Sequence, residues 1–288
     1  MLSSVLQQVI QHKLGEGGLQ FSKVSGGSIN ETYRVETSVG RRYFCKCNSA
    51  TKFPHLFEGE IVGLTLISSH GIIRTPSVIG CFEAGGQQVL LLEWIEECKP
   101  TNEFWKLFGE QIARLHHVTA DQFGFATSNY MGAVPQVNNH AATWSDFFRK
   151  NRLTPLADKC HQQELLTANH LSQLEKLYAK LDTVFDVVNP ALLHGDLWSG
   201  NFLCHAASLP VVIDPAVYFG HRSMDLAMTT LFGGFDASFY DSYQYHFPLP
   251  ANFREQWEVC NLYPLLIHLY LFGKSYLPQI QNIFQRFS

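Results

Sequence analysis

Asp196 and Asn201 are the residues whose types and spacing most clearly suggest chemistry. They lie in LLHGDLWSGNFL, residues 192–203, directly after an apolar stretch. Together with His194 they match the spacing H-x-D-x-x-x-x-N of a kinase catalytic loop. In such a loop the aspartate accepts a proton from a substrate hydroxyl, and the asparagine reaches back to a metal ion on the nucleotide. In the structural alternative, Asp196 caps a helix and His194 is an ordinary core histidine.

A second carboxylate, Asp214, ends the apolar segment PVVID, residues 210–214. It follows Asp196 by 18 residues, which is where kinases place the aspartate that binds Mg²⁺, although the motif here is Asp-Pro-Ala and not Asp-Phe-Gly. Mg²⁺ needs few protein oxygens when phosphate and water complete its coordination shell. Asp214 and Asn201 are therefore the predicted metal ligands. The structural alternative for Asp214 is a turn residue before Pro215.

Lys46 lies between two cysteines on a predicted strand, so its side chain should point to the opposite face from both thiols. A lysine on that strand can bind the α- and β-phosphates of a nucleotide, and it needs a carboxylate to hold it. Glu60, on the following predicted helix, is the candidate, and Glu58 is the alternative. An ordinary strand lysine and a solvated helix glutamate are the structural readings of Lys46 and Glu60.

Two further segments are predicted to contact the nucleotide. The Gly-rich turn at 25–28, between two predicted strands, can cover phosphates with backbone N–H groups, although a plain hairpin explains it equally well. The segment 92–95 leads from the strand-rich part into the helical part, and its exposed backbone can bind adenine. The predicted nucleotide-binding residues are Gly26, Gly27, Ser28, Lys46, Glu60, Leu92, Glu93, Trp94 and Ile95.

The elements that must position these residues follow from periodicity and from turn residues. Residues 21–49 alternate as strands, a helix is predicted over about 55–69, and two strands then meet at Gly85-Gly86. After Ile95 the pattern becomes helical, with Thr101 as a cap for a helix through about 117. A loop-rich section and a long amphipathic helix over about 161–185 follow. Two short strands then flank the catalytic loop.

This order predicts an α+β, bilobal protein-kinase-like fold. Residues 1–95 would form a small N-terminal antiparallel β lobe with one helix, which binds the nucleotide. Residues 96–288 would form a larger, mostly helical C-terminal lobe for catalysis and substrate binding. Only a short stretch separates Asp214 from the next predicted helix, which leaves no room for an activation loop. The pattern therefore favours a small-molecule kinase. Asp225, at the start of that helix, is predicted to brace the catalytic loop, or else to be a simple N-cap.

The composition excludes several other classes of protein. Charged residues make up 16% of the 288 residues and the formal net charge is −4, so nucleic acid and anionic membranes are not expected partners. Seven scattered cysteines argue against a disulfide framework and for a reducing compartment. Residues 1–13 are predicted to form an amphipathic helix and not a signal peptide, and the apolar stretch 263–272 is too short to span a bilayer. We expect a cytoplasmic protein.

The sequence resembles the fructosamine (ketosamine-3-) kinase family, which is related in fold to aminoglycoside phosphotransferases and choline kinases. The most specific match is LLHGDLWSGN, in which the insert Trp198-Ser199-Gly200 is characteristic of the family. The resemblance extends over nearly the whole chain. The other matching segments are SGGSINETYRV, NYMGAVPQVN, TWSDFFRKNRLTPL, IDPAVYFGHR with DLAM, and LYPLLIHLYLFGKSYL.

The resemblance implies a function and a set of roles. The function would be ATP-dependent phosphorylation of the 3-hydroxyl of ketosamines in deglycation, acting on fructosamine or ribulosamine and including glycated lysine. Asp196 would be the catalytic base, with Mg²⁺ held by the two predicted ligands. The segment 129–138 would shape the sugar pocket, and Trp198 would stack on the sugar or, equally, be a buried core residue. The candidate substrate-binding residues are Asn129, Gln136, Asn138 and Trp198.

Two positions of this sequence differ from the family pattern, and two rival functions are compatible with the same motifs. Ser223 occupies a position that is usually Glu in the family, which could alter loop bracing or substrate contacts. Ser28 lies near a position where some members carry a cysteine, so a redox switch in that turn is not expected. The first rival function is a kinase of an aminoglycoside, choline or a free sugar, and the second is a non-catalytic nucleotide-binding module. The preferred sugar and amine, the choice between a free metabolite and a protein, and the oligomeric state are not specified by the sequence.

Overall fold

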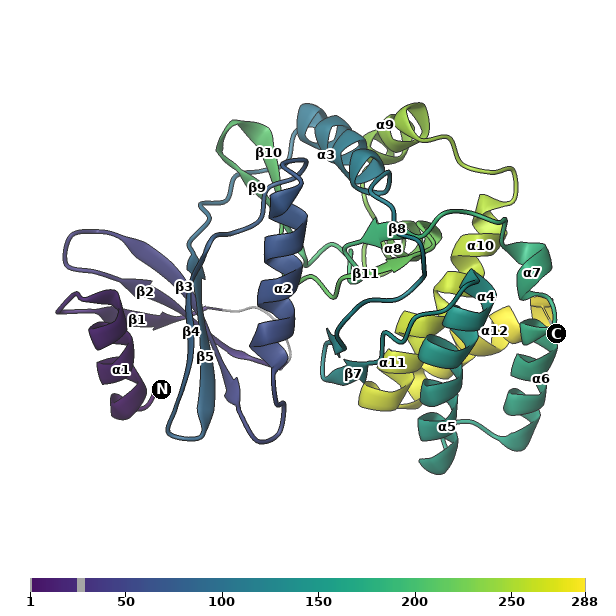
Figure 1. Cartoon of the computed structure of the whole chain (residues 1–288), viewed down its shortest axis with the longest axis horizontal. Coiled ribbons are helices and arrows are strands. Elements are labelled where there is room, and N and C mark those ends of the chain that lie inside the picture. The colour runs from purple at the N-terminus through teal and green to yellow at the C-terminus, as the bar shows by residue number, and fades with distance from the viewer. Residues whose placement is uncertain (1, 25–28, 288) are drawn as a thin grey trace.

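A five-stranded antiparallel sheet forms the N-terminal end of the computed structural model, which describes residues 2–24 and 29–287 (Figure 1). The strand order is β1-β2-β3-β5-β4, so β3 and β5 pair in the interior of the sheet. The apolar run predicted as a buried strand is β5, and its residues 88–92 are buried. The strands are β1 Gln20–Lys23, β2 Glu31–Glu36, β3 Arg42–Ser49, β4 Val78–Ala84 and β5 Gln87–Glu93.

Side chains along β3 alternate between the two faces of the sheet, so that each face carries a different kind of residue. Cys45 and Cys47 point to one face and pack with α1 (Ser4–Leu14), whereas Lys46 points to the other, where α2 (Leu56–Ser69) lies. Figure 1 shows the two helices on opposite sides of the sheet. The prediction that Lys46 faces away from both thiols is confirmed, and this places its ammonium group beneath α2.

Contacts at the start and in the middle of α2 fix its position. At its start, the side-chain Oε1 of Gln88 on β5 accepts a hydrogen bond from the backbone N–H of Phe57 at 3.3 Å. Further along, Gly63 lies against Pro215 of the C-terminal part. A Cβ atom at residue 63 would come within 2.9 Å of Pro215 Cγ, so glycine permits this close approach. The helix that carries Glu60 is therefore held between the sheet and the C-terminal part.

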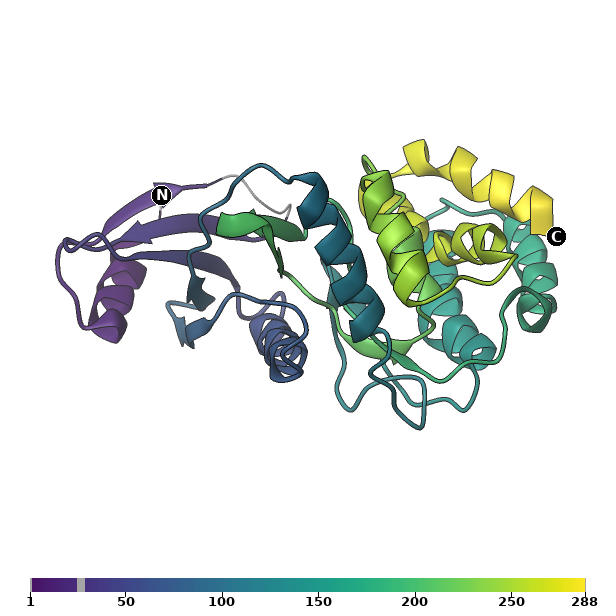
Figure 2. The ribbon, with the colours of Figure 1, turned by 90° about the horizontal axis from the view of Figure 1, so that it is seen from above.

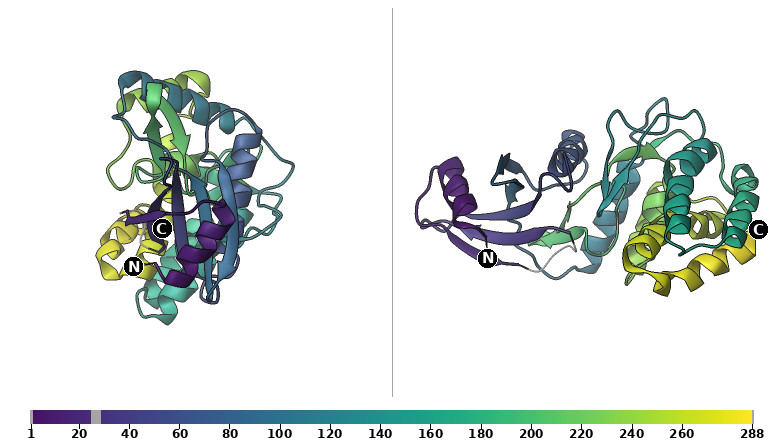
Figure 3. Two further views of the ribbon diagram at one scale, coloured as in Figure 1. Left: turned by 90° about the vertical axis from the view of Figure 1, so that its left-hand side faces the viewer. Right: turned by 90° about the horizontal axis from the view of Figure 1, so that it is seen from below.

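The C-terminal part is mostly helical, and Figures 2 and 3 show it at the opposite end of the elongated molecule from the sheet, with α12 along its outer side. Thr101 caps α3 as predicted, because its Oγ1 accepts a hydrogen bond from Phe104 N. The helices are α3 Asn102–Leu115, α4 Trp144–Phe147, α5 Thr154–Gln162, α6 Ala168–Tyr178, α7 Leu181–Val184, α8 Ser223–Met228, α9 Ala237–His246, α10 Phe253–Cys260, α11 Leu262–Phe272 and α12 Leu277–Phe287, with short helical turns η1 Phe148–Leu153, η2 Ala206–Ser208 and η3 Lys274–Tyr276.

Three short antiparallel pairs of strands complete the C-terminal part. The pair β8 and β11 and the pair β9 and β10 surround the catalytic loop, while β6 and β7 form a small hairpin in the section predicted to be loop-rich. These strands are β6 Asn129–Met131, β7 Val134–Gln136, β8 Ala191–Leu193, β9 Phe202–His205, β10 Leu209–Val212 and β11 Tyr218–Gly220.

The single long helix predicted over 161–185 is wrong. The structure has the end of α5, then α6 and α7, in this region. Glu164 has a left-handed backbone with φ of 57°, which ends α5. Thr167 then starts α6 with a capping box in which His170 supplies the reciprocal bond. Local capping thus overrides a hydrophobic stripe that continues across the break.

The observed architecture confirms the α+β, bilobal kinase-like fold class. The sheet ends at Glu93 and α3 begins at Asn102, on either side of the boundary predicted at 95/96. Two large apolar clusters fill the C-terminal part, one around α11 and α12 and one around α3 and α9. In the described ranges, 2–24 and 29–287, no helix is both long and apolar enough to cross a membrane.

Candidate active site

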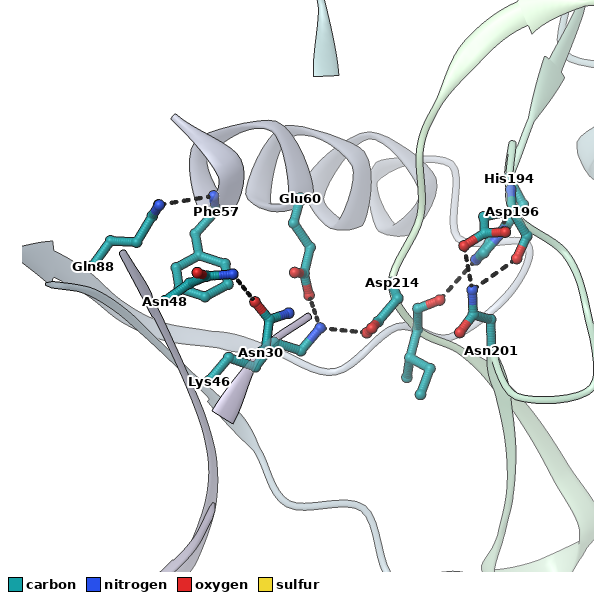
Figure 4. Close-up of polar contacts among 11 residues, drawn as sticks. Asn30, Lys46, Asn48, Phe57, Glu60, Gln88, His194, Asp196, Asn201 and Asp214 are labelled. Carbon is teal, nitrogen blue, oxygen red and sulfur yellow. Dashed lines mark hydrogen bonds and ion pairs between the residues drawn. The ribbon is translucent and has the colours of Figure 1, made fainter. Parts of the chain in front are cut away.

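The predicted catalytic loop, residues 194–201, begins where β8 ends and finishes where β9 starts. In it, the side-chain Nδ2 of Asn201 donates to Asp196 at 2.9 Å, both to the carboxylate Oδ2 and to the backbone oxygen (Figure 4). Gly195 has φ of +84°, and a Cβ atom there would lie 2.0 Å from the backbone oxygen of Ala216, so only glycine fits. These contacts hold Asp196 and Asn201 side by side, as the motif spacing predicts.

His194 is a fully buried structural member of this loop. Its Nε2–H donates to the backbone oxygen of Ile213 at 2.9 Å, and its Nδ1 accepts from the backbone N–H of Asp196 at 3.3 Å. Burial lowers the pKa of His194, which favours the neutral ring that this pattern of bonds requires. His194 is therefore a core histidine whose two ring nitrogens both have hydrogen-bond partners. The polar groups that face the cavity belong to other residues of the loop.

Asp225 on α8 braces the loop from behind. Its Oδ2 accepts the backbone N–H of His194 at 2.7 Å, and its Oδ1 accepts that of Gly195 at 2.8 Å. His116, directly after α3, donates to the same carboxylate at 3.2 Å and accepts from the hydroxyl of Tyr243 at 2.8 Å. Asp225, His116, Tyr243 and His194 are buried and Gly195 is half-buried, so the turn that presents Asp196 rests on a hydrogen-bonded network that involves α8, α9 and the end of α3.

Asp214 meets Lys46 across the junction between the sheet and the C-terminal part. The lysine Nζ lies 2.5 Å from Asp214 Oδ1 and 2.7 Å from Glu60 Oε1 (Figure 4). The structure thus pairs Lys46 with Glu60, whereas Glu58, the other candidate, is exposed and bonded to His55. Asp214 has a left-handed backbone with φ of 54°, a conformation that Asp tolerates and that recurs at functional sites.

Burial and neighbouring charges shift the pKa values of these groups. Burial first, and then the nearby charge of Asp214, raise the pKa of Asp196 to about 7. Burial likewise raises the pKa of Glu60 to about 7, against the opposing effect of Lys46. Burial lowers the pKa of Lys46, but Asp214 and Glu60 together outweigh it and raise that pKa to about 12. A carboxylate with a pKa near neutrality is suited to accepting a proton.

These polar groups line one end of a cavity of about 470 Å³ between the two parts of the molecule. Glu60, Asp196, Asn201 and Asp214 all contribute to its wall. Among the described residues, no group of three or more His, Cys, Asp or Glu side chains is placed to hold a metal ion. The amide oxygen of Asn201 and the carboxylate of Asp214 are nonetheless a sufficient protein contribution for Mg²⁺ beside a nucleotide phosphate.

Another part of the cavity wall is aromatic, and most of it was not predicted from the sequence. Trp198 is half-buried, lines the cavity and packs edge-on to Phe232 with ring centroids 6.1 Å apart. Phe232 has a left-handed backbone and contacts the ring of His268 at 4.5 Å. We use the name aromatic wall for Trp198, Phe232, His268, Phe272 and Tyr276. Only Trp198 carried a signal in the sequence, because the other side chains come from segments far away in the chain.

The predicted sugar-pocket residues of β6 and β7 divide into two groups. Asn129 lines the cavity, but the side chains of Gln136 and Asn138 are 1% exposed and do not line it. The Nε2 of Gln136 donates to the side chain of Asn129 at 2.8 Å and to Ala216 O at 3.1 Å, and the Nδ2 of Asn138 donates to Asn129 at 3.3 Å. The expectation that all three contact substrate directly is therefore corrected. Gln136 and Asn138 support Asn129 from behind.

A buried arginine completes that support. Arg152 is fully buried, donates to Asn138 Oδ1 at 2.6 Å and to Val137 O at 2.5 Å, and lies 4.1 Å from the ring centroid of Tyr218. The sequence shows Arg152 only as one of several basic residues in FFRKNRL. Nothing local distinguishes it from its exposed neighbour Arg149, so its role emerges only from the tertiary structure.

The predicted nucleotide-binding segments are placed as follows. Gly26, Gly27 and Ser28 lie outside the described residues. The side chains of Leu92 and Ile95 are buried, Trp94 is half-buried, and Glu93 pairs with Arg74. None of the residues of 92–95 lines the cavity described above.

Ser223, the departure from the family pattern, is buried at the start of α8. Its Oγ donates to Gln256 Oε1 on α10 at 2.8 Å, and Gln256 in turn donates to Asp186 at 2.6 Å. Ser223 does not line the cavity. Its hydrogen bond joins α8 to α10. Because α8 also carries Asp225, the change from Glu to Ser affects the helix that braces the loop and not the wall of the cavity.

Comparison with known proteins identifies the family. The model of the fructosamine kinase family matches residues 1–288. The chain belongs to the fructosamine kinase family. Ketosamine-3-kinase of mouse is 30% identical over 98% of this chain and 100% of its own length. A solved structure from Thermobifida fusca is 31% identical, covers 98% of this chain and 97% of its own, and has a TM-score of 0.86.

More distant solved structures share the fold of this fructosamine kinase family member. A choline/ethanolamine kinase family protein from Mesorhizobium loti is 16% identical, with a TM-score of 0.57, and covers 98% of this chain and 93% of its own. An aminoglycoside-3'-phosphotransferase of type VIII is 15% identical, with a TM-score of 0.55, and covers 90% and 98%. The expected relation in fold to both groups is confirmed, and membership of the family makes the chain a kinase, with ATP as phosphoryl donor.

Proposed function

We propose that this protein uses ATP and Mg²⁺ to phosphorylate the 3-hydroxyl of ketosamines, of the fructosamine or ribulosamine type, in deglycation. The observation that carries the proposal is the meeting of Asp196, Asn201 and Asp214 at one end of a single cavity, with the Lys46–Glu60 pair beside it. Three of these residues come from the C-terminal part and two from the sheet and α2. Their convergence in a member of the fructosamine kinase family is what the transfer of a phosphoryl group requires.

Asp196 is the catalytic base in this proposal. Its carboxylate accepts the proton of the attacking 3-hydroxyl, and the Asn201 amide group that donates to it keeps it oriented. Lys46, held by Glu60, orients the α- and β-phosphates. Asn201 and Asp214 would hold Mg²⁺, which would offset the negative charge of the phosphates. Positioning and electrostatic stabilisation supply most of the rate enhancement in such a transfer.

The adenine ring is proposed to bind along the backbone of 92–95. The backbone N–H of Glu93 already donates to Ser77 O at 2.9 Å. Donors for adenine therefore have to come from the residues that follow, Trp94 and Ile95. The turn that contains Gly26, Gly27 and Ser28 is proposed to cover the phosphates.

The acceptor is proposed to lie between Asp196 and the aromatic wall. Trp198 offers a ring face to the sugar, and Asn129 offers polar atoms at the side of the cavity. Both a small ketosamine and a glycated lysine of a protein present a sugar that would enter the cavity ahead of the amine. We therefore propose both classes as partners of this site.

A panel of acceptors tests the proposal. Purified enzyme with ATP and Mg²⁺ is offered a fructosamine, a ribulosamine, an aminoglycoside, choline and a free sugar, and phosphorylated products are identified by mass and by the position of the phosphate. The proposal expects kcat/KM for a ketosamine to exceed that for the other three classes, with phosphate on the 3-hydroxyl. Preferred turnover of an aminoglycoside, choline or free sugar would establish the rival function, and ATP binding without turnover of any acceptor would establish a non-catalytic module.

A further inference from the structure

Two cysteines meet where the segment between the sheet and α3 crosses the C-terminal part. The Sγ atoms of Cys98 and Cys204 are 3.1 Å apart, although the residues are 106 positions apart in the chain. Cys98 belongs to the connecting segment and Cys204 to β9, the strand that begins directly after Asn201. Figure 1 shows the β9–β10 hairpin beside that segment. The proposed function uses neither thiol.

Backbone pairing fixes the positions of the two cysteines relative to each other. Glu97 and His205 form an antiparallel bridge, and the backbone N–H of Cys98 donates to Cys204 O at 2.7 Å. Cys98 and Cys204 are therefore directly opposite each other in an antiparallel register. Opposite residues have Cα atoms about 4.5–5.5 Å apart, which lies within the range of about 4.4–6.8 Å that a disulfide needs. Both strands can thus keep their backbone positions when the two sulfurs bond.

The two thiols differ in their exposure to solvent, so they should react in a fixed order during oxidation. Cys98 is exposed and Cys204 is 3% exposed. Burial, followed by the hydrogen bond with Cys98, raises the pKa of Cys204 to about 12. An oxidant from solution therefore reaches the Cys98 sulfur first, and Cys204 is the partner that completes the bond from inside.

We propose that Cys98 and Cys204 form an oxidation site that closes to an intramolecular disulfide with a small-molecule disulfide as oxidant. The Cys98 thiolate attacks one sulfur of the oxidant, forms a mixed disulfide and releases one thiolate. Cys204 then gives up its proton and attacks the Cys98 sulfur, and the second half of the oxidant leaves as a thiolate. The two protein thiols lose two electrons and two protons in total, and the oxidant is reduced to two thiols.

The bond would tie the connecting segment to the strand that follows Asn201. It closes a very long loop, so it reduces the conformational freedom of the unfolded chain more than a short-range disulfide would. An exposed disulfide is also readily reduced, which suits a reversible site in a chain whose scattered cysteines indicate a reducing compartment.

Another thiol pair shows why proximity alone is not sufficient. Cys45 and Cys47 have Sγ atoms 3.7 Å apart, but both side chains are at most 1% exposed and lie on one face of one strand. No oxidant can reach them in the folded protein, so they serve as an internal control. Cys81 is exposed and can serve as a control for an accessible single thiol.

The test treats the folded full-length protein with oxidised glutathione, and then measures free thiols, intact mass, peptide maps and Tm. We expect Cys98 and Cys204 to be lost as free thiols, no glutathione to remain on either of them, and a Cys98–Cys204 peptide to appear, whereas the exposed single thiol Cys81 retains any glutathione that it takes up. Tm should rise by roughly 5 °C or more and return with dithiothreitol. Cys204→Ser should retain glutathione on Cys98, Cys98→Ser should form no intramolecular disulfide, and Cys81→Ser should still form the Cys98–Cys204 disulfide.

Retention of all seven thiols, glutathione that persists on Cys98 of the unmodified chain, or a disulfide mapped to any other pair would overturn the proposal. None of these measurements needs a substrate or turnover. Failure of the oxidation site is therefore distinguishable from failure of the proposed kinase function, which the acceptor panel tests separately.

Discussion

Asp196 is the residue on which the proposed transfer depends most directly. It lines the cavity, Asn201 holds its carboxylate, and burial raises its pKa to about 7. We expect Asp196→Ala to lower kcat by at least about 100-fold, because the attacking hydroxyl loses its base. ATP affinity should stay close to that of the unmodified enzyme. Steady-state kinetics with the best ketosamine, together with calorimetric titration of ATP, measures both, and near-normal turnover would remove Asp196 from its role.

Glu60 is a second residue whose contribution can be isolated. Its carboxylate lies 2.7 Å from Lys46 Nζ, and we expect Glu60→Gln to reduce kcat/KM for ATP roughly tenfold through loss of a charge-assisted hydrogen bond. Glu58→Gln is the matched control, since Glu58 lies on the same helix but is 69% exposed and contacts His55. The same initial-rate assay over a range of ATP concentrations compares the two variants. Equal effects of both changes would show that the Lys46–Glu60 pair has no special part in nucleotide use.

At the scale of elements, the turn η1 contributes a buried arginine that supports the cavity wall. Arg152→Met removes its bonds to Val137 O and Asn138 Oδ1 and leaves the buried side-chain oxygen of Asn138 without this donor. We expect a loss of about 3 kcal/mol in the free energy of unfolding, measured by urea denaturation. Arg149→Met, in the same turn, should change it by about 1 kcal/mol or less, because Arg149 is half exposed, pairs with Glu175 at the surface and lies 4.7 Å from the ring centroid of Tyr178. Similar losses in the free energy of unfolding for both variants would show that the buried hydrogen bonds of Arg152 make no special contribution to stability.

Elements were predictable from the sequence wherever a local signal decides the conformation. Alternation located β3 and the face of Lys46, and the cap at Thr101 located α3. The break between α5 and α6 was missed because the apolar stripe continues past Glu164, where a left-handed residue ends the first helix. Motif spacing was sufficient to predict that Asp196, Asn201 and Asp214 lie close together, because all three come from two short segments that are near each other in the chain.

The remaining parts of the site depend on tertiary contacts that no local pattern encodes. Gln136 and Asn138 have the polar side chains expected of a sugar site, but packing turns them away from the cavity and toward Asn129. The aromatic wall gathers Phe232 and His268 from segments on opposite sides of α9 and α10 in the chain. Apolar residues of this kind are usually assigned to a core, and only the fold shows which of their faces is open.

At the scale of the whole molecule, the cavity exists because the two parts are held at a fixed separation. Direct contacts join them near the site. Tyr130 OH donates to Pro54 O at 3.1 Å, and Val212 N donates to Arg74 O at 3.0 Å. Gly63 of α2 packs on Pro215, the residue that follows Asp214. The distance between Glu60 and Asp214, which share Lys46, therefore depends on a residue without a side chain.

This arrangement leads to a prediction about Gly63. Gly63→Val would place a branched side chain where even a Cβ atom comes within 2.9 Å of Pro215 Cγ, so α2 must move away from the C-terminal part. We expect kcat/KM for ATP to fall roughly tenfold as Glu60 and Lys46 shift from Asp214, with a loss of about 1–3 kcal/mol in stability from overpacking. Gly80→Val in β4 is the control, because no atom lies within 4 Å of a Cβ atom there. If Gly63→Val used ATP as well as Gly80→Val does, the spacing of the two parts would not be set by this contact.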